Sequence, residues 1–170
     1  MFMSGLDAEE RELYPGSVDR DSTLRDSPVN CAMPTIDCIF CHPQAESVIW
    51  SDARCRVLLV TDTPFAGFCR VVWRDHVAEF TELDRASRDH LMSVVAAVER
   101  SLRDLLSPDK VNLASLGNMM PHLHWHVIPR WRDDSHFPDA IWAAERRRGV
   151  PRELPPDFVT KVRKALDPLR

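Results

Sequence analysis

Short apolar runs with a two-residue alternation, followed by one long helical period, predict a mixed α and β fold. Runs rich in β-branched and aromatic residues occupy 47–50, 55–60 and 69–73, with turn-forming Ser, Asp, Pro and Gly between them. Short strands joined by short turns are typical of an antiparallel meander. Similar runs at 111–115 and 123–129 predict two more strands. The pattern therefore predicts an antiparallel sheet of about five strands.

Between 84 and 106 a helical period replaces the alternation. Apolar residues recur there every three or four positions, and these are Leu91, Val94, Val95, Val98, Leu102, Leu105 and Leu106. Asp84 is a suitable N-cap, and Ser107-Pro108-Asp109 is a suitable stop. A shorter helix is predicted at about 156–166. The chain is therefore predicted to be α+β, with one main helix and a short C-terminal helix.

Composition divides the chain into three parts. Residues 1–35 carry many charges, Ser and Pro without a sustained apolar period, which predicts a flexible N-terminal extension. Residues 36–132 form the predicted domain, and 133–170 form a polar, proline-containing C-terminal tail that ends in the short helix. A content of 44% hydrophobic and 28% charged residues is ordinary for a globular protein. We therefore predict one folded domain with two flanking segments.

Charge and cysteine content narrow the setting of the protein. A net charge of −4 and a pI near 6.0 favour neither nucleic acid nor an anionic membrane as a partner. No apolar run spans a bilayer, and no basic region followed by an apolar stretch opens the chain. Five cysteines without an export signal predict thiols or metal ligands, with Cys55 and Cys69 as buried core residues. A cytoplasmic protein is predicted.

The segment His122-Leu123-His124-Trp125-His126 alternates imidazoles with apolar side chains. In a strand the three histidines share one face, and Leu123 and Trp125 point to the other. Neighbouring histidines on that face lie about 6.5 to 7 Å apart at Cβ, close enough to surround one phosphate or one metal ion. Clustered imidazoles cost desolvation and repel one another when protonated, so packing alone does not explain them. We predict a chemical site on this face and core on the other.

Residues 122–128 resemble the signature of the histidine triad (HIT) superfamily of nucleotide hydrolases and transferases, His-φ-His-φ-His-φ-φ, where φ is apolar. The strings at 38–41, 67–76 and 112–118 resemble other parts of the same family. The string at 114–121 resembles a bacterial diadenosine tetraphosphate hydrolase-like subgroup. The resemblance implies the HIT fold, a nucleotide substrate and a homodimer in which two sheets join.

For the triad, the resemblance implies a division of roles. His124, the middle histidine, would attack the α-phosphorus of a nucleotide, and water would then hydrolyse the nucleotidyl-histidine to release a nucleoside monophosphate. His126 would donate to phosphoryl oxygens, and His122 would orient the cluster. The substrate would be a nucleoside phosphoramidate or a dinucleoside polyphosphate.

Polar residues before the triad are the candidates for substrate binding. Asn112 resembles the site-lining asparagine of the family, Gly117 belongs to the approach to the triad, and Asn118 stands where many members carry Gln. Ordinary hydrogen bonding at turns and strand ends is the alternative for both asparagines. Met119 stands where many members carry Ser or Thr, which assist the leaving group. Because a thioether cannot donate a proton, either the leaving group differs or another residue supplies that proton.

An apolar slot for the nucleoside is expected near the first strands. Its candidates are Ile49 or Trp50, Val60 and the loop 62–65, although strand residues of this kind are more often core. Arg130, Trp131 and the tail through Trp142 either cover the site or reach a dimer partner, and the sequence leaves both open.

Cys38 and Cys41 have the Cys-x-x-Cys spacing that lets two thiolates bind one tetrahedral Zn²⁺. Free thiols are the alternative. The resemblance implies that His76 and His122 complete the site, because zinc-binding members use the corresponding histidines. The zinc would then be structural. No organic cofactor is predicted.

Two other functions compete with a HIT-type nucleotide hydrolase. One is a metal-dependent hydrolase in which His122, His124 and His126 are the ligands, although the triplet contains no Asp or Glu to act as base. The other is a non-catalytic, nucleotide-binding regulatory module, because an intact nucleophile does not report a rate.

Overall fold

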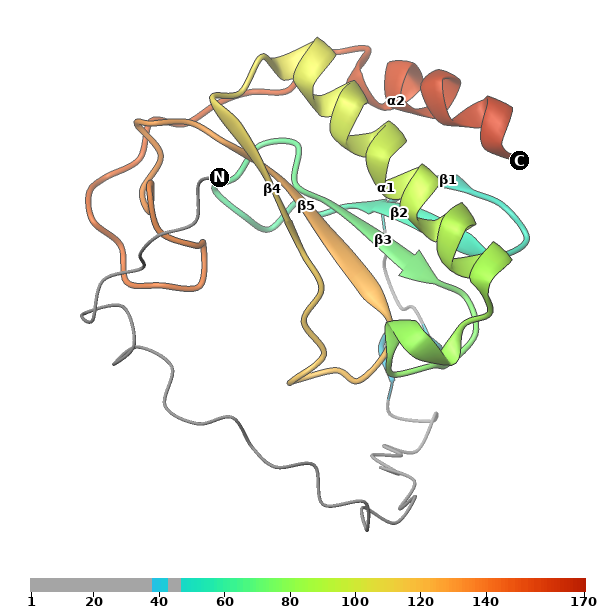
Figure 1. The fold of residues 1–170 in the computed structure, drawn as a ribbon. Coiled ribbons are helices and arrows are strands. Elements are labelled where there is room, and N and C mark those ends of the chain that lie inside the picture. The colour runs from blue at the N-terminus through green and yellow to red at the C-terminus, as the bar shows by residue number, and fades with distance from the viewer. Residues whose placement is uncertain (1–37, 43–46) are drawn as a thin grey trace, which may run out of the picture. The chain divides into compact units, whose positions relative to one another are not determined.

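The computed structural model describes residues 38–42 and 47–170, which belong to one compact unit. The predicted extension, residues 1–35, lies outside the described residues. Five strands form one antiparallel sheet in the order β1-β2-β3-β5-β4 (Figure 1). They are β1 (Val48–Ser51), β2 (Cys55–Leu59), β3 (Cys69–Trp73), β4 (Lys110–Ala114) and β5 (His124–Arg130). The predicted five-stranded antiparallel sheet is confirmed.

Helix α1 (Arg85–Leu106) crosses one face of the sheet, and α2 (Phe158–Leu166) lies beside it (Figure 1). Single 3-10 turns, η3 (Phe80–Glu82) and η4 (Asp167–Leu169), precede α1 and follow α2. Asp84 caps α1 by accepting a hydrogen bond from the Ser87 backbone N–H at 2.7 Å, and Ser107 ends it in the left-handed conformation with φ 47°. The predicted main helix and short C-terminal helix are therefore confirmed.

Helix α2 is part of the main core. Its residues Phe158, Val162 and Leu166 are buried in the same apolar cluster as the stripe of α1 and the adjacent sheet face. The segment 133–170, described from composition as a tail, thus completes the core that begins with the strands. Composition did not indicate this packing, because three apolar residues in a polar segment do not by themselves predict that the segment joins the core.

The two faces of the sheet differ in chemistry. Toward α1 lie Cys55 and Cys69, both fully buried as predicted, together with Val127 and the partly buried Trp125. On the opposite face, which we call the triad face, strand register places Arg70 of β3 beside His126 of β5 and Val72 beside His124. The alternation of residues along the strands therefore separates the apolar face that packs against α1 from the face that carries the histidines.

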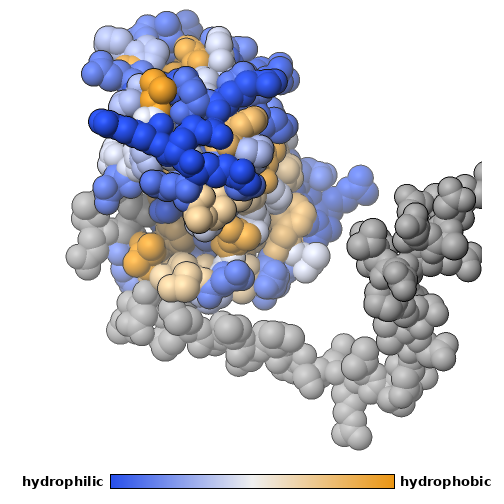
Figure 2. Space-filling view, turned by 90° about the vertical axis from the view of Figure 1, so that its left-hand side faces the viewer, coloured by the Kyte–Doolittle hydropathy of each residue, from blue (hydrophilic) through white to orange (hydrophobic). Residues whose placement is uncertain are grey.

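Hydrophobic residues also reach the surface in places. On the face drawn in Figure 2 they form separate groups scattered among hydrophilic residues, which predominate toward the top of the view. None of the helices within the described residues is long and apolar enough to cross a membrane.

Candidate active site and metal-ligand cluster

The three predicted triad histidines come together on the triad face. His124 and His126 lie on β5, His122 precedes the strand by two residues, and all three side chains are buried. The Nε2 atoms of His124 and His126 are 3.1 Å apart, and the centroids of these two rings are 4.7 Å apart. The pair therefore shares one hydrogen bond between ring nitrogens.

The backbone determines which nitrogen of His124 is free to react. Its Nδ1 lies 2.6 Å from the carbonyl oxygen of His122, which can only accept a hydrogen bond, so in the neutral ring Nδ1 carries the proton. The lone pair is then on Nε2, beside His126. The Ser115 hydroxyl donates to the His124 carbonyl oxygen at 2.9 Å and fixes the strand here. Sequence reasoning missed Ser115, because one serine at a strand end has no distinctive pattern.

Burial favours the uncharged form of these imidazoles. It lowers the pKa of His122 and of His124 below the usual 6.5, with additional lowering by nearby positive charge. The pKa of His126 falls to about 3, through burial first and then through electrostatic interaction with the neighbouring His124 ring and the Arg70 guanidinium. The lone pair of a buried, neutral His124 is available for attack at neutral pH.

A cavity of about 430 Å³ opens beside His124 and His126, and we call it the triad pocket. Its walls are Ile39, Phe40, Arg70, Leu116, Asn118, Met119, Met120, His124, His126 and Trp142. Its apolar lining comes from three separate parts of the chain: the segment after Cys38, the approach to β5, and the C-terminal segment.

A second cavity of about 340 Å³, which we call the strand pocket, shares three walls with the triad pocket: Ile39, Phe40 and Arg70. Val60 and Asp62, two of the residues expected near a nucleoside, line it. The other two strand candidates do not. Ile49 and Trp50 are instead buried in the main apolar core. For these two residues the alternative prediction, that they are core residues, is confirmed.

The predicted substrate-binding residues separate in space. Asn118 lines the triad pocket, whereas Asn112 and Gly117 are absent from the described linings of both pockets. The side-chain oxygen of Asn112 accepts a hydrogen bond of 2.7 Å from Nη1 of Arg130. The structure thus brings Asn118 to the triad and holds Asn112 in a different network.

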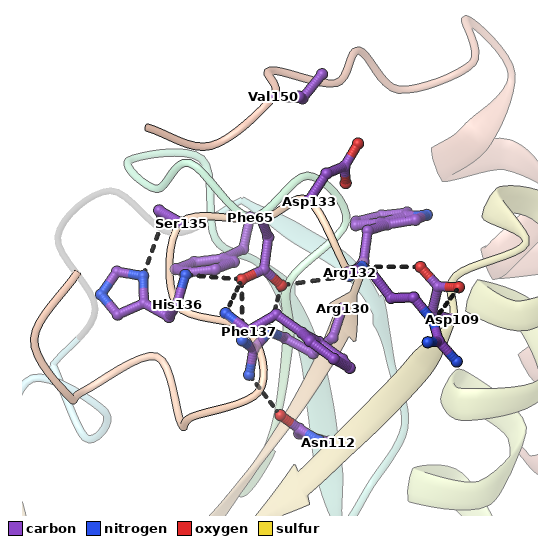
Figure 3. A network of polar contacts seen from close by, with 12 residues as sticks. Phe65, Asp109, Asn112, Arg130, Arg132, Asp133, Ser135, His136, Phe137 and Val150 are labelled. Atoms are coloured by element: carbon purple, nitrogen blue, oxygen red, sulfur yellow. Dashed lines mark hydrogen bonds and ion pairs between the residues drawn. The ribbon is translucent and has the colours of Figure 1, made fainter. Parts of the chain in front are cut away.

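That network is centred on a buried ion pair at the end of β5 (Figure 3). The Asp134 carboxylate accepts hydrogen bonds from Nε and Nη2 of Arg130 at 2.7 and 3.0 Å. It also accepts from the backbone N–H groups of His136 at 2.9 Å and Phe137 at 2.7 Å. Burial raises the pKa of Asp134, but these hydrogen bonds and the charge of Arg130 outweigh it and lower the pKa to about 2. The pair anchors the chain that follows β5.

The anchored chain returns to the triad. Trp142 lies at its end, with its ring centroid 5.2 Å from that of His126 and half of its surface exposed. The structure therefore places Trp142 beside His126 of its own chain.

The four predicted metal ligands also converge. The donor atoms of Cys38, Cys41, His76 and His122 all lie within 4.8 Å of one another. Nδ1 of His122 is 3.4 Å from the Cys38 sulfur and 3.6 Å from the Cys41 sulfur, and Nδ1 of His76 is 3.2 Å from the Cys41 sulfur. For Zn²⁺ with typical bond lengths, the sulfur–nitrogen edge of the tetrahedron is about 3.6 Å. The spacing therefore fits a tetrahedral ion.

The ring orientation of His122 fits the same interpretation. Its Nε2 donates to the Trp73 carbonyl oxygen at 2.7 Å, so in the neutral ring the lone pair is on Nδ1, which faces the two thiols. Metal-bound histidines commonly have their second nitrogen held by a carbonyl in this way.

Fold and site together define a small α+β protein with a buried histidine cluster at the wall of a pocket. Residues 43–133, more than half of the chain, match the family described as HIT domain. The chain belongs to the HIT domain family, which supports a nucleotide-binding or hydrolase role. No curated protein matches the chain.

Solved structures of histidine triad proteins are similar to the chain. One from Bradyrhizobium japonicum is 26% identical with a TM-score of 0.59, the match covering 69% of this chain and 88% of that one. One from Marinobacter aquaeolei is 29% identical with a TM-score of 0.56, covering 73% and 88%. A Zn-bound histidine triad family protein from Mycobacterium smegmatis is 21% identical with a TM-score of 0.53, covering 80% and 97%, and at that identity it supports the fold alone.

Proposed function

We propose that the protein is a nucleotide hydrolase that cleaves at the α-phosphorus of a nucleoside phosphoramidate or a dinucleoside polyphosphate. The observation that carries the proposal is the orientation of His124, whose Nδ1 is held by a backbone carbonyl while Nε2 faces His126 at the pocket wall. Nε2 forms a bond to phosphorus, and the bond from phosphorus to the leaving group breaks. Water then cleaves the phosphorus–nitrogen bond and releases a nucleoside monophosphate.

Neighbouring residues have supporting roles in this proposal. His126 donates from Nε2 to a phosphoryl oxygen in place of its present hydrogen bond to His124. Arg70, opposite His126 in the sheet and lining both pockets, adds positive charge where the phosphate binds. Asn118 contacts the substrate directly. Asn112 and Gly117 act indirectly, Asn112 through Arg130 and Gly117 through the path of the chain before β5.

A specific observation separates this proposal from a metal-dependent hydrolase. Among the described residues, the ligand cluster on the triad side contains His122 but neither His124 nor His126. His122 turns its lone pair toward the thiols, whereas His124 and His126 face each other and the pocket. A nucleophilic role for His124 is therefore favoured over a role as ligand.

The test is covalent capture of the intermediate. The wild-type protein is incubated with adenosine phosphoramidate and, separately, with diadenosine tetraphosphate; AMP release is followed, and acid-quenched samples are digested for peptide mass spectrometry. We expect AMP release and an adenylyl adduct on the peptide that contains His124. Release without an adduct, lost on chelation, would favour the metal-dependent hydrolase. Binding without release from either substrate would favour the regulatory module.

We also propose that Cys38, Cys41, His76 and His122 bind one structural zinc ion. The support is the tetrahedral spacing of the four donors and the orientation of His122. The ion would connect the segment before β1, the turn after β3 and the start of β5. It would thereby position the catalytic strand without contacting the substrate.

Replacing Cys41 with serine is the matching prediction. We expect the zinc content of the purified protein to fall well below one ion per chain. The free energy of unfolding should fall by about 1 to 3 kcal/mol, because the bound ion no longer stabilises the folded state. The variant should stay folded, since the domain keeps its own apolar core. Zinc is measured by elemental mass spectrometry and stability by urea titration. Cys69→Ser is the control, a buried thiol in the core, which should keep its zinc. Equal zinc in both variants would contradict the proposed site.

We also propose that the protein forms a homodimer. β4 lies at an edge of the sheet and exposes Leu113, so two copies could join their sheets there. Light scattering after gel filtration measures the assembly directly. A monomer at micromolar concentration would contradict it.

A further inference from the structure

A second group of metal-ligating side chains lies away from the triad face, where the turn between β1 and β2 meets α1. The donor atoms of Asp52, Cys55 and His90 all lie within 4.8 Å of one another. Cys55 begins β2 and His90 lies on α1, 35 positions later in the chain. Because no local pattern joins these residues, only the packing of the helix on the sheet brings the three donors together.

The turn before β2 fixes two of the donors. Oδ1 of Asp52 accepts hydrogen bonds from the backbone N–H groups of Arg54 at 2.8 Å and Cys55 at 2.7 Å. The backbone N–H of Asp52 in turn donates to the Cys55 carbonyl oxygen at 3.0 Å. The other carboxylate oxygen, Oδ2, faces His90. One hydrogen-bonded turn therefore presents an oxygen and a sulfur three residues apart, the spacing at which Cys-x-x-Cys pairs bind one ion.

His90 supplies the third donor. Its Nε2 is 2.7 Å from Oδ2 of Asp52 and 3.9 Å from the Cys55 sulfur. For a tetrahedral ion with typical bond lengths, the nitrogen–oxygen edge is about 3.3 Å and the nitrogen–sulfur edge about 3.6 Å. Each distance lies within about 0.6 Å of its edge, a difference that small rotations of the side chains remove. The His90 side chain is 18% exposed, which gives an ion a path from solvent.

The charges of the three donors suit a divalent transition metal. Burial raises the pKa of Asp52, but hydrogen bonds from two backbone N–H groups and from His90 outweigh it and lower the pKa. Burial first, and then the charge of Asp52, raise the pKa of the Cys55 thiol to about 12. A metal ion displaces such a proton when it binds the sulfur. A carboxylate, a thiolate and an imidazole together balance two positive charges, and they favour Zn²⁺ or Co²⁺ over Mg²⁺ or Ca²⁺.

We propose that Asp52, Cys55 and His90 form a second transition-metal site, which takes Zn²⁺ or Co²⁺ and joins the β1–β2 turn to α1. On binding, the Cys55 thiol loses its proton to solvent. The proton on Nε2 of His90, which now faces the carboxylate, moves to Nδ1, so that the lone pair on Nε2 binds the ion. Water takes the fourth position of the tetrahedron. The site is separate from the histidine pair on β5 and from the four-donor cluster.

This second site should bind metal more weakly than the proposed four-donor zinc site. It has one protein donor fewer, and the guanidinium groups of Arg54 and Arg74 lie near enough to act on the Cys55 thiol. Their positive charge favours the thiolate but repels a divalent ion. We therefore expect the second site to fill only when metal is added to the purified protein.

The test is a Co²⁺ titration of the full-length wild-type protein, purified with its zinc. Zn²⁺ binds thiolate and imidazole donors at least as tightly as Co²⁺, so it stays in the four-donor cluster. A bond between cobalt and a thiolate gives a charge-transfer absorption that other ligands do not give. We expect about one equivalent of Co²⁺ per chain to bind with this absorption. Saturation with Co²⁺ should also raise the melting temperature.

Variants then assign the absorption to residues. Cys55→Ser should abolish the charge-transfer absorption. His90→Gln changes a partly exposed side chain, so the protein should fold normally but bind Co²⁺ at least about tenfold more weakly. Cys69→Ser is the matched control, because Cys69 is a buried thiol on the adjacent strand that is absent from both described ligand groups. It should keep both the absorption and the affinity.

Three results would overturn the proposal. The first is binding without the thiolate absorption, which would place Co²⁺ on other side chains. The second is an absorption that survives in His90→Gln with unchanged affinity but disappears in Cys41→Ser, which would assign the ion to the four-donor cluster. The third is the absence of binding to the folded wild-type protein at millimolar Co²⁺. None of these results bears on the hydrolase proposal, which is tested by the adduct on His124.

Discussion

Replacing His124 with alanine is expected to lower kcat/KM for AMP release by at least about a thousandfold, because removal of a covalent nucleophile leaves only the binding and charge contributions of the site. The side chain is buried, and its loss also removes the hydrogen bond to His126 at 3.1 Å. The measurement is initial-rate AMP release from adenosine phosphoramidate, with substrate binding followed separately. We expect binding to persist while turnover is lost.

The control for this variant is the replacement of another histidine, one that lies outside the proposed catalytic site. His90 lies on α1 and pairs with Asp52 at 2.7 Å, outside both pockets of the triad face. His90→Gln should retain most of the turnover. A thermal melt on each variant separates chemistry from folding. Near-normal turnover by a folded His124→Ala protein would rule out the nucleophile assigned here.

Replacing Asp134 with asparagine is expected to reduce the free energy of unfolding by about 3 to 5 kcal/mol, because it leaves the buried Arg130 guanidinium without its charge partner. Only 1% of the Arg130 side chain and 8% of the Asp134 side chain are exposed. Urea unfolding of the wild type and the variant measures the loss.

A surface ion pair next to Asp134 provides the control. Asp133 pairs with Arg152 at 2.8 Å, with about half of the Asp133 side chain exposed, and Asp133→Asn should cost less than about 1 kcal/mol. The pH dependence gives a second check. Because the pKa of Asp134 in the folded protein is about 2, below its ordinary value of 3.8, its stabilisation is complete above about pH 5 and is lost progressively as the pH falls through 2. Equal losses for both variants would argue against a dominant buried pair.

Several features of the site could be predicted because they depend on local periodicity. Alternation along a strand puts residues i and i+2 on one face whatever the rest of the chain does, so the shared face of His124 and His126 follows from the sequence alone. The stripe of α1 and its Asp84 cap follow from similarly short-range rules. The convergence of Cys38 and Cys41 with His76 came from the resemblance to a family, because residues so far apart in sequence have no periodicity that joins them.

Other features escaped prediction because they depend on a choice between partners. Asn112 alternates onto the triad face as expected, but a buried guanidinium that needs an acceptor binds its side-chain oxygen. The residue types of Ile49 and Trp50 suit a nucleoside slot and a core equally well, and the packing of α2 against β1 assigns both to the core. Residue type was compatible with both outcomes in each case.

The sequence by itself determined the strands, the helices, the division of β5 into a chemical and an apolar face, and the family to which they belong. Tertiary structure alone decided that α2 completes the core, that Arg130 and Asp134 anchor the chain after β5, and that Trp142 returns to His126. The reason is the range of the interactions. Hydrogen-bond periodicity acts over a few residues, whereas the return of a loop to a distant strand depends on burial and charge pairing that exist only once the sheet has formed.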